Sequence, residues 1–504
     1  MSEFIDLVRA SLGPDAREEF DARVDRQAAY LIDEIESGRL DNTGFAIGLE
    51  LESYGVDATG HLATLPDAVF EVCNKELGLH NLELNSDPSP FDADGLDQQA
   101  TAISDVVHDA RTAFHEVDLE LVLDAMWTIP PPTGTLAYLR EIDRVDGFVV
   151  ASNMRRSARY CALDNDVLDR HGGSIELDLP GCRESFPTIL PEALTTSIQP
   201  HLQIPSTARF PRYYNTAIRT MAPILALAAN SPLLPTDLYS AVDDPYELLE
   251  ETYHELRIPV FEQSINAGDD KVRFPDDIES ASEVVSKIAD DAVRAPFLRE
   301  WIEDDDPDGF RDGFWELDHK RGMYWRWLRG IPGGQPVGDG SERSLRIEYR
   351  PLPTQPSVSD NIGLQWLTVG VIRGLVAADH PLATLEWTTA RSGFYDVVEE
   401  GLDAAIPWVD RSGTRTDDKE VVFSELFEFA RQGLRAAGVA TERIDSYLDP
   451  IEARWQARCS PSRWKLDAVE SSLDVGASLE AAITEMQMVY NERSTADVPF
   501  ADWL

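Results

Sequence analysis

Two short segments of the chain carry carboxylates on alternate positions of a predicted β-strand. In residues 44–52, apolar residues occupy every second position, so Glu50 and Glu52 lie together on the opposite face of the strand. Residues 80–85 repeat the pattern and place Glu83 on the polar face. An antiparallel sheet with one solvated face ordinarily carries such acids, so neither strand alone identifies a site.

Two further segments extend the pattern to other ligand types. Residues 197–204 and 345–350 also alternate, and their polar positions are Gln199, His201, Gln203, Arg346, Glu348 and Arg350. If the four strands share one sheet, one face gathers carboxylates, amides, an imidazole and guanidinium groups. Clustered carboxylates repel each other unless a cation neutralises them. Oxygen-rich clusters of this kind suit Mg²⁺, which proteins often share with substrate phosphates.

These segments, together with three others, resemble the glutamate–cysteine ligase type 2 family of carboxylate–amine ligases. The order and spacing of the motifs carry the resemblance more than any single motif does. In chain order they are Gly48-Leu-Glu-Leu-Glu52, Glu76 seven residues before Glu83, Gln199 two residues before His201, Leu225-Ala-Leu-Ala-Ala-Asn-Ser-Pro232, Glu348-Tyr-Arg350 and Ala390-Arg-Ser-Gly393.

The resemblance implies a fold and a reaction. We expect an α+β protein with a glutamine-synthetase-like catalytic domain, whose curved, mainly antiparallel sheet forms a funnel flanked by helices. The implied reaction uses ATP to phosphorylate the γ-carboxyl of glutamate, because a carboxylate is a poor electrophile. The amine of cysteine then attacks the acyl phosphate and gives γ-glutamylcysteine. The cofactor is Mg²⁺ or Mn²⁺, which offsets the charge of the transferring phosphoryl group.

The resemblance also assigns roles to the residues in the motifs. His201 is expected near the nucleotide or a metal, although a satisfied structural histidine is an equal alternative. Arg350 is expected to stabilise the transferring phosphoryl group, because a guanidinium offers planar donors to phosphate oxygens; its alternative is a structural ion pair. The expected metal ligands are Glu50, Glu52, Glu76, Glu83, Gln199 and Glu348.

Substrate carboxylates require further arginines, and the candidates are Arg155, Arg159 and Arg212. Each of them also fits a structural ion pair. The segment after Pro232, residues 233–240, lacks the Gly and Arg that the family usually has there. Two alternatives therefore stay open: another carboxylate–amine ligase or phosphotransferase on the same scaffold, and a non-catalytic nucleotide- or metal-binding relative.

Composition narrows the class of protein. The 504 residues carry 91 acidic and 44 basic side chains, a net charge of −47, and only six of the basic residues are Lys. An acidic, Lys-poor surface along the whole chain resembles halophilic archaeal proteins, in which salt screens the self-repulsion. The sequence has no cluster of basic residues, so nucleic acid is not an expected partner. The expected partners are small molecules.

Cysteine usage and hydropathy favour a cytoplasmic protein. The four cysteines form no CxxC pair, so neither a disulfide framework nor a zinc site is expected. No signal peptide is recognised, and no apolar run approaches the ~20 residues that span a bilayer. No membrane partner is expected.

The chain divides into three predicted regions. They are an N-terminal helical extension at 1–43, a catalytic domain at 44–410 with an acidic insertion at about 240–340, and a C-terminal helical region at 411–504. Further strands are predicted at 149–153 and 174–179, and an acidic loop at 304–309. Helices are predicted at 1–40 (one or two), 97–118, 212–229, 283–303, 360–377, 384–404, 419–437, 441–457 and 475–492.

Overall fold

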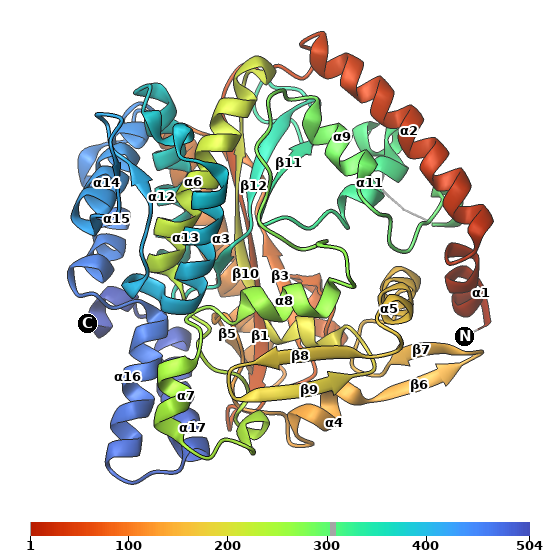
Figure 1. Cartoon of the computed structure of the whole chain (residues 1–504), viewed down its shortest axis with the longest axis vertical. Helices are drawn as coiled ribbons and strands as arrows, with labels where there is room; N and C mark the ends of the chain where they lie inside the picture. The colour runs from red at the N-terminus through yellow and green to blue at the C-terminus, as the bar shows by residue number, and fades with distance from the viewer. Residues whose placement is uncertain (1, 303–308) are drawn as a thin grey trace.

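A nine-stranded antiparallel sheet forms the centre of the molecule (Figure 1). The computed structural model describes residues 2–302 and 309–504. The strands follow the order β11-β12-β10-β1-β3-β2, and β4 and β5 pair with β1 while β13 pairs with β10. Their bounds are β1 Ala46–Asp57, β2 Asn74–Lys75, β3 Asn81–Asn85, β4 Ser89–Pro90, β5 Leu119–Val122, β10 Ser197–Gln203, β11 Leu328–Pro332, β12 Leu345–Tyr349 and β13 Leu352–Pro353.

The four strands predicted from alternation are neighbours in this sheet, in the order β12-β10-β1-β3. Glu52 faces Glu83 across the β1–β3 pair, and Glu50 faces Gln199 across the β1–β10 pair. In the next pair, His201 of β10 faces Glu348 of β12. Because side chains alternate between the two faces of a strand, these registers bring the predicted polar residues to one face of the sheet.

Helices cover the opposite, apolar face. The nearest are α3 Ala93–His115, α6 Phe210–Ala228 and α12 Val358–Ala377, with α13 Trp387–Glu400, α14 Lys419–Arg435 and α15 Thr441–Gln456 outside them (Figure 1). Nearly every residue of α12 is buried, because it packs against helices and the sheet on all sides. Gly370 lets α12 approach α14 closely, since a Cβ there would lie 2.9 Å from the carbonyl oxygen of Ala430.

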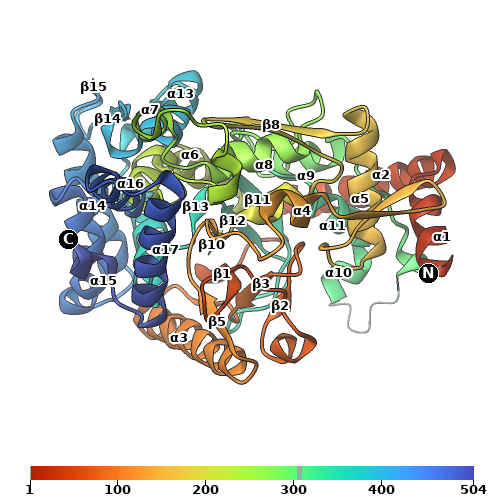
Figure 2. The same ribbon diagram turned by 90° about the horizontal axis from the view of Figure 1, so that it is seen from below.

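The polar face is bordered by other parts of the chain. Helices α2, α5, α9 and α11 lie on the side of the sheet away from α14 and α15 in both views (Figures 1 and 2). The bounds are α1 Ser2–Ser11, α2 Pro14–Glu36, α4 Thr135–Arg140, α5 Ala158–Arg170, α7 Pro245–Glu251, α8 Arg257–Ile265, α9 Glu283–Asp290, α10 Gly309–Gly313 and α11 Trp315–Arg321. Two hairpins complete this side, β6 Ile142–Val145 with β7 Phe148–Ala151 and β8 Ile175–Leu179 with β9 Cys182–Phe186.

The C-terminal helices α16 Pro461–Asp474 and α17 Leu479–Thr495 are joined to the sheet by a buried polar network. The ammonium of Lys465 binds a carboxylate oxygen of Asp124 at 2.6 Å and the carbonyl oxygen of Asn230 at 2.8 Å. The hydroxyl of Tyr490 accepts a hydrogen bond from the side chain of Asn230. Asn230 of the Asn-Ser-Pro motif, which follows α6, therefore connects α16 and α17 with Thr354, the residue after β13.

The expected fold class is confirmed: the protein is α+β, with an antiparallel sheet flanked by helices. The predicted strand at 149–153 is β7, which lies in a separate hairpin. The predicted helix at 283–303 was too long, since α9 ends at Asp290 and residues 291–298 form irregular structure. Helix α16 was not predicted; it begins at Pro461, after the N-cap Ser460.

Two further predictions concern parts of the chain that the structure tests less directly. The acidic loop predicted at 304–309 lies, apart from Gly309, outside the described residues. The division into three regions stays a prediction. Within the described residues, no helix is long and apolar enough to cross a membrane.

Candidate functional site

Three carboxylates from two strands and a preceding loop form the first acidic group. Glu52 lies on β1, Glu83 on β3, and Glu76 directly follows β2. One oxygen of each residue lies within 4.8 Å of an oxygen of each of the others. The cross-strand pairing of Glu52 with Glu83 creates this proximity, and β2 brings Glu76 to the same edge. Three converging carboxylates of this kind are a typical divalent-cation site.

A second group lies beside the first and contains Glu50, His201 and Glu348. Nε2 of His201 is 3.2 Å from Oε1 of Glu50. Nε of Arg346 donates a hydrogen bond to Nδ1 of His201 at 3.2 Å, and Nε2 of the imidazole faces Glu50. Neighbouring positions on β1, β10 and β12 create this group, as the registers of those strands require.

Gln199 and Arg350 lie between the two groups. Nε2 of Gln199 donates to Oε1 of Glu52 at 2.9 Å, and Oε1 of Gln199 accepts a hydrogen bond from Nη1 of Arg350. The same nitrogen of Arg350 donates to Oε1 of Glu348 at 2.9 Å. The predicted metal ligand Gln199 therefore joins Glu52 to the arginine, and its amide oxygen already has a donor.

Little positive charge offsets the first group. Burial and the nearby charges of Glu50 and Glu52 raise the pKa of Glu83 to about 8. Burial, with the charges of Glu83 and Glu52, raises the pKa of Glu76 well above its ordinary value. A hydrogen bond from Asn85 to Glu83 at 2.6 Å only partly opposes this rise. At neutral pH these carboxylates therefore need either protons or a cation.

Arginines neutralise the second group. Nε and Nη2 of Arg329 donate to the two oxygens of Glu348, the second at 3.0 Å, and Arg350 adds a third bond. Burial opposes the charge of Glu348, but the two arginines lower its pKa well below the ordinary value. Burial likewise opposes the charge of Glu50, and His201 lowers its pKa.

Two cavities border these groups, and a third adjoins both cavities. The main cavity has a volume of about 260 Å³ and is lined by the whole first group and by Glu50 of the second. Its charged and amide side chains besides these are Arg159, Glu192, Gln199, Arg329 and Arg350. The remaining lining residues are Leu77, Tyr160, Leu163, Ile189, Phe261, Ile265, Gly322, Met323 and Trp325. A second cavity of about 240 Å³ borders Glu50, His201 and Arg346, and its remaining wall is largely apolar or backbone. A third, of about 330 Å³, is lined by Arg159, Arg311, Arg321 and Arg346.

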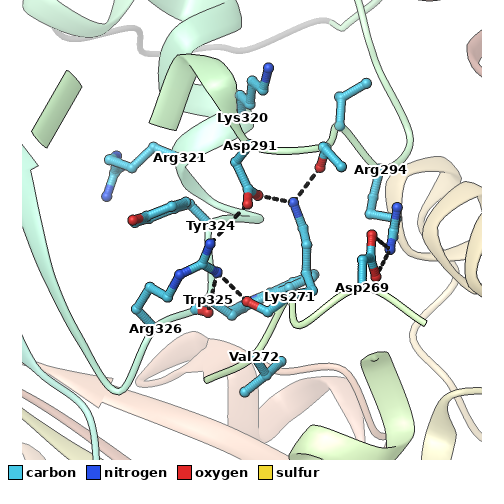
Figure 3. A network of polar contacts seen from close by, with 12 residues as sticks. Asp269, Lys271, Val272, Asp291, Arg294, Lys320, Arg321, Tyr324, Trp325 and Arg326 are labelled. Carbon is cyan, nitrogen blue, oxygen red and sulfur yellow. Dashed lines mark hydrogen bonds and ion pairs between the residues drawn. The ribbon is translucent and has the colours of Figure 1, made fainter. Parts of the chain in front are cut away.

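A buried ion-pair network holds the segment that carries Trp325. Lys271 and Arg326 both bind the carboxylate of Asp291, the latter at 3.0 Å, and Arg326 also donates to the carbonyl oxygen of Trp325 (Figure 3). In Figure 3, the guanidinium of Arg321 points away from Asp291. This network therefore fixes one wall of the main cavity and leaves Arg321 to the arginine-lined cavity.

The three predicted substrate arginines lie in different places. Arg159 lines both the main and the arginine-lined cavity. The guanidinium of Arg155 lies over the ring of Phe70, 3.9 Å from its centroid. Arg212 pairs with Asp379 at 2.7 Å on the surface, outside the three cavities described above. Of the three, only Arg159 is brought to the predicted metal ligands.

Four charged residues at the site were not predicted as functional residues from the sequence. Arg329 lies on β11, a strand that alternation did not reveal, and Glu192 lies in a short 3₁₀ helix with no periodic pattern. Arg346 was recognised on its strand but given no role. Arg257 follows the Asn-Ser-Pro segment, and its backbone N–H donates to the hydroxyl of Ser231 at 3.1 Å. Only Arg346 carried a signal in the sequence.

Comparison with known proteins agrees with this architecture. The model of a family described as glutamate–cysteine ligase family 2 matches residues 46–490. A glutamate–cysteine ligase from Francisella tularensis, solved in complex with AMP, has a TM-score of 0.52 at 14% identity, over 91% of this chain and 93% of that chain. A bifunctional glutathione synthetase from Pasteurella multocida has a TM-score of 0.50 at 13% identity.

The Pasteurella protein is much longer than this chain. The match covers 93% of this chain but only 54% of the Pasteurella protein. At such identities the two structures show a common fold alone. No curated protein sequence matches the chain.

Proposed function

Since the chain belongs to glutamate–cysteine ligase family 2, we propose that it is an ATP-dependent ligase that joins the γ-carboxyl of glutamate to the amine of cysteine. The observation that carries the proposal is the pair of acidic groups on one sheet face, with Arg350 and Gln199 between them. Six side chains from five segments converge there, although the chain as a whole is strongly self-repelling. Such convergence suits the transfer of a phosphoryl group between two anions.

The donor set of the first group fits a hard divalent cation. Its members offer carboxylate oxygens only, and burial together with the charges of neighbouring carboxylates raises the pKa values of Glu76 and Glu83. Glu52, Glu76 and Glu83 would hold one Mg²⁺ or Mn²⁺, and Glu50, His201 and Glu348 would hold another. When bound, the ions offset the charge of the β- and γ-phosphates.

The cavity beside His201 suits the nucleotide. It reaches Glu50 and His201 at one end, and Ile47, Pro88 and Val337 supply apolar contacts further out. A nucleotide lying there would direct its phosphates towards the metal ligands and Arg346, while the base packs against the apolar wall. The Francisella ligase was solved with AMP, which agrees with nucleotide binding by this fold.

The arginines assist phosphoryl transfer. Arg350 and Arg329 lie in the main cavity and are held rigidly by Glu348. Preorganised donors of this kind stabilise negative charge that develops in a transition state. In the proposed reaction they hold the oxygens of the transferring group while the γ-carboxylate of glutamate attacks. The amine of cysteine then attacks the acyl carbon, and phosphate leaves.

The loop after Pro232 lacks the arginine that the family usually has, and Arg257 partly replaces it. Arg257 is buried and pairs with Glu255 at 3.2 Å. Burial raises the pKa of Glu52, and the charges of Arg350 and Arg257 oppose this rise. The acceptor pocket is therefore built differently here. Another carboxylate–amine ligase or a phosphotransferase remains the second candidate for this reason.

The decisive experiment is ADP release from Mg²⁺, ATP and glutamate, with each amino acid added in turn, in molar KCl. We expect cysteine to stimulate release more than alanine or serine does. The high salt matches the net charge of −47, which salt would screen. Stimulation by another amine instead of cysteine would favour the second candidate. ATP binding without any turnover would favour a non-catalytic relative.

A further inference from the structure

Two ionisable side chains of opposite type, Glu192 and Arg159, line the main cavity. Neither the carboxylate of Glu192 nor the guanidinium of Arg159 makes a hydrogen bond or ion pair within residues 2–302 and 309–504. They also do not pair with each other. Burial raises the pKa of Glu192 to about 8, and a cationic group beside the carboxyl would favour its charged form. An ionisable group in a cavity wall is costly to leave without a partner, so proteins rarely keep one unless it meets a ligand.

Glu192 is held rigidly at the cavity wall. It lies in the 3₁₀ helix Leu190–Leu194, whose leucines are buried at both ends and which packs against α8. The preceding residue Ile189 donates its N–H to Asp164 at 2.8 Å, which fixes the start of this helix. Glu192 belongs to neither acidic group. Its carboxyl group therefore lines the same cavity as the predicted metal ligands without belonging to either acidic group.

Arg159 reaches the cavity because residue 322 is glycine. A Cβ at Gly322 would lie 2.5 Å from Nη2 of Arg159, and the side chain would have to move. The backbone φ of Gly322 is −58°, a value that alanine adopts without strain. Asp318 lies near enough to influence the charge of Arg159, but the two make no ion pair. The guanidinium thus stays open to the cavity.

We propose that Glu192 and Arg159 bind the head group of an amino-acid substrate, with the α-ammonium on Glu192 and the α-carboxylate on Arg159. A head group with two carboxylates would meet repulsion at Glu192, and one with two ammonium groups would meet it at Arg159. A zwitterion satisfies both. The inference rests on the proposed function for the identity of the amino acid, and it deepens that proposal by naming the residues that select it.

Analogues that lack one charge test the assignment. Glutarate is glutamate without the ammonium, and 4-aminobutyrate is glutamate without the α-carboxylate. For the wild type, calorimetry in molar KCl should give tighter binding of glutamate than of either analogue, by roughly 10- to 100-fold, because each charged hydrogen bond contributes that much. Glu192→Gln should abolish the preference over glutarate alone. Arg159→Gln should abolish the preference over 4-aminobutyrate alone.

Two control variants separate recognition from folding. Gly322→Ala should displace Arg159 without unfolding the protein, and should reproduce the Arg159→Gln preferences. Glu262→Gln removes a half-buried carboxylate outside the cavity that accepts hydrogen bonds from Trp327 and Tyr395. It should lower Tm and leave both preferences intact, whereas Glu192→Gln should not lower Tm, because Glu192 has no partner to lose.

The same variants distinguish this inference from the ligase proposal. If the wild type releases ADP with glutamate but both variants keep the wild-type preferences, the assignment is wrong and the ligase stands. If no ADP is released but the preferences respond to the variants, the assignment stands and the ligase reaction is wrong. A change in KM for cysteine, with KM for glutamate constant, places the pair at the acceptor amine. Equal binding of glutamate and both analogues by the wild type would overturn the assignment of the head group to Glu192 and Arg159.

Discussion

The two acidic groups lie side by side on one sheet face, yet their charges are balanced in opposite ways. Glu348 in one group receives three hydrogen bonds from Arg329 and Arg350, and its pKa is low. Glu76 and Glu83 in the other group face mainly other carboxylates, and their pKa values are high. Arginines already balance Glu348 in the second group, whereas the first group, Glu52, Glu76 and Glu83, is complete only with protons or a cation bound.

This difference predicts that the two groups contribute oppositely to folding. An arginine-paired carboxylate stabilises the fold, and its loss leaves buried cations without partners. Carboxylates that repel each other destabilise the fold until a cation binds. Four experiments follow from this contrast.

The largest effect is expected from Glu348→Gln. The change leaves Arg329 and Arg350 buried without their carboxylate, which should lower the free energy of unfolding by about 3–5 kcal/mol. Denaturant unfolding would measure it. Glu428→Gln, which breaks the exposed pair with Arg411, is the control and should cost less than ~1 kcal/mol. A similar small loss for Glu348→Gln would mean that the arginines find other partners.

Arg350→Lys should lower kcat by at least ~10-fold and as much as ~1000-fold, since one preorganised donor to transition-state charge is worth ~2.7–4 kcal/mol. Lysine keeps the charge but cannot bind Gln199 and Glu348 with one planar group. Steady-state ADP release measures the change. Arg415→Lys, at an exposed site near Thr389, is the matched control. An unchanged kcat with a raised KM for glutamate would reassign Arg350 to substrate binding.

The metal-free protein should lose stability as pH rises from about 4.5 to about 8. Glu83 has a pKa near 8 in the folded protein and an ordinary value of 4.5, so the folded state holds a proton that the unfolded chain releases. Each such proton lowers stability by ~1.4 kcal/mol per pH unit. Unfolding in EDTA across this range measures the slope.

Two comparisons check this explanation of the slope. Glu83→Gln should make it shallower by one proton, and saturating Mg²⁺ should counteract it, because the cation replaces the proton. Glu348 should act in the opposite sense: its lowered pKa makes it stabilising above about 4.5, and this stabilisation is lost as pH falls. A slope that is identical in the Glu83→Gln variant would show that other groups titrate.

The smallest effect is expected from Glu76→Gln without metal. Removing one of three repelling carboxylates should raise the free energy of unfolding at pH 8 by about 1 kcal/mol, as a relief of like-charge repulsion. The same variant should bind Mg²⁺ more weakly, so saturating Mg²⁺ should raise its Tm less than that of the wild type. A Glu76→Gln variant that is less stable than the wild type in EDTA would contradict the contrast between the groups.

Strand alternation was enough to predict which residues share the polar face. The period of two on β1, β3, β10 and β12 specifies the face of each side chain without any knowledge of neighbours. The strands then had only to pair in one sheet, as they do. Helix α3 presents one apolar stripe that must be buried, whereas α12 is apolar on nearly all sides and is buried on all of them.

Tertiary structure decided which charged group each of these side chains meets. The sequence places Glu348 and Glu83 on equivalent polar faces, but only the pairing of β11 with β12 brings Arg329 to one of them. Glu192 lies in a short 3₁₀ helix without a periodic signal, and the packing of this helix against α8 brings it to the cavity. Arg159 lies at the start of α5, and the glycine at position 322 leaves room for its guanidinium there. Periodicity gives the direction of a side chain, whereas the charge that it meets depends on contacts between residues far apart in the chain.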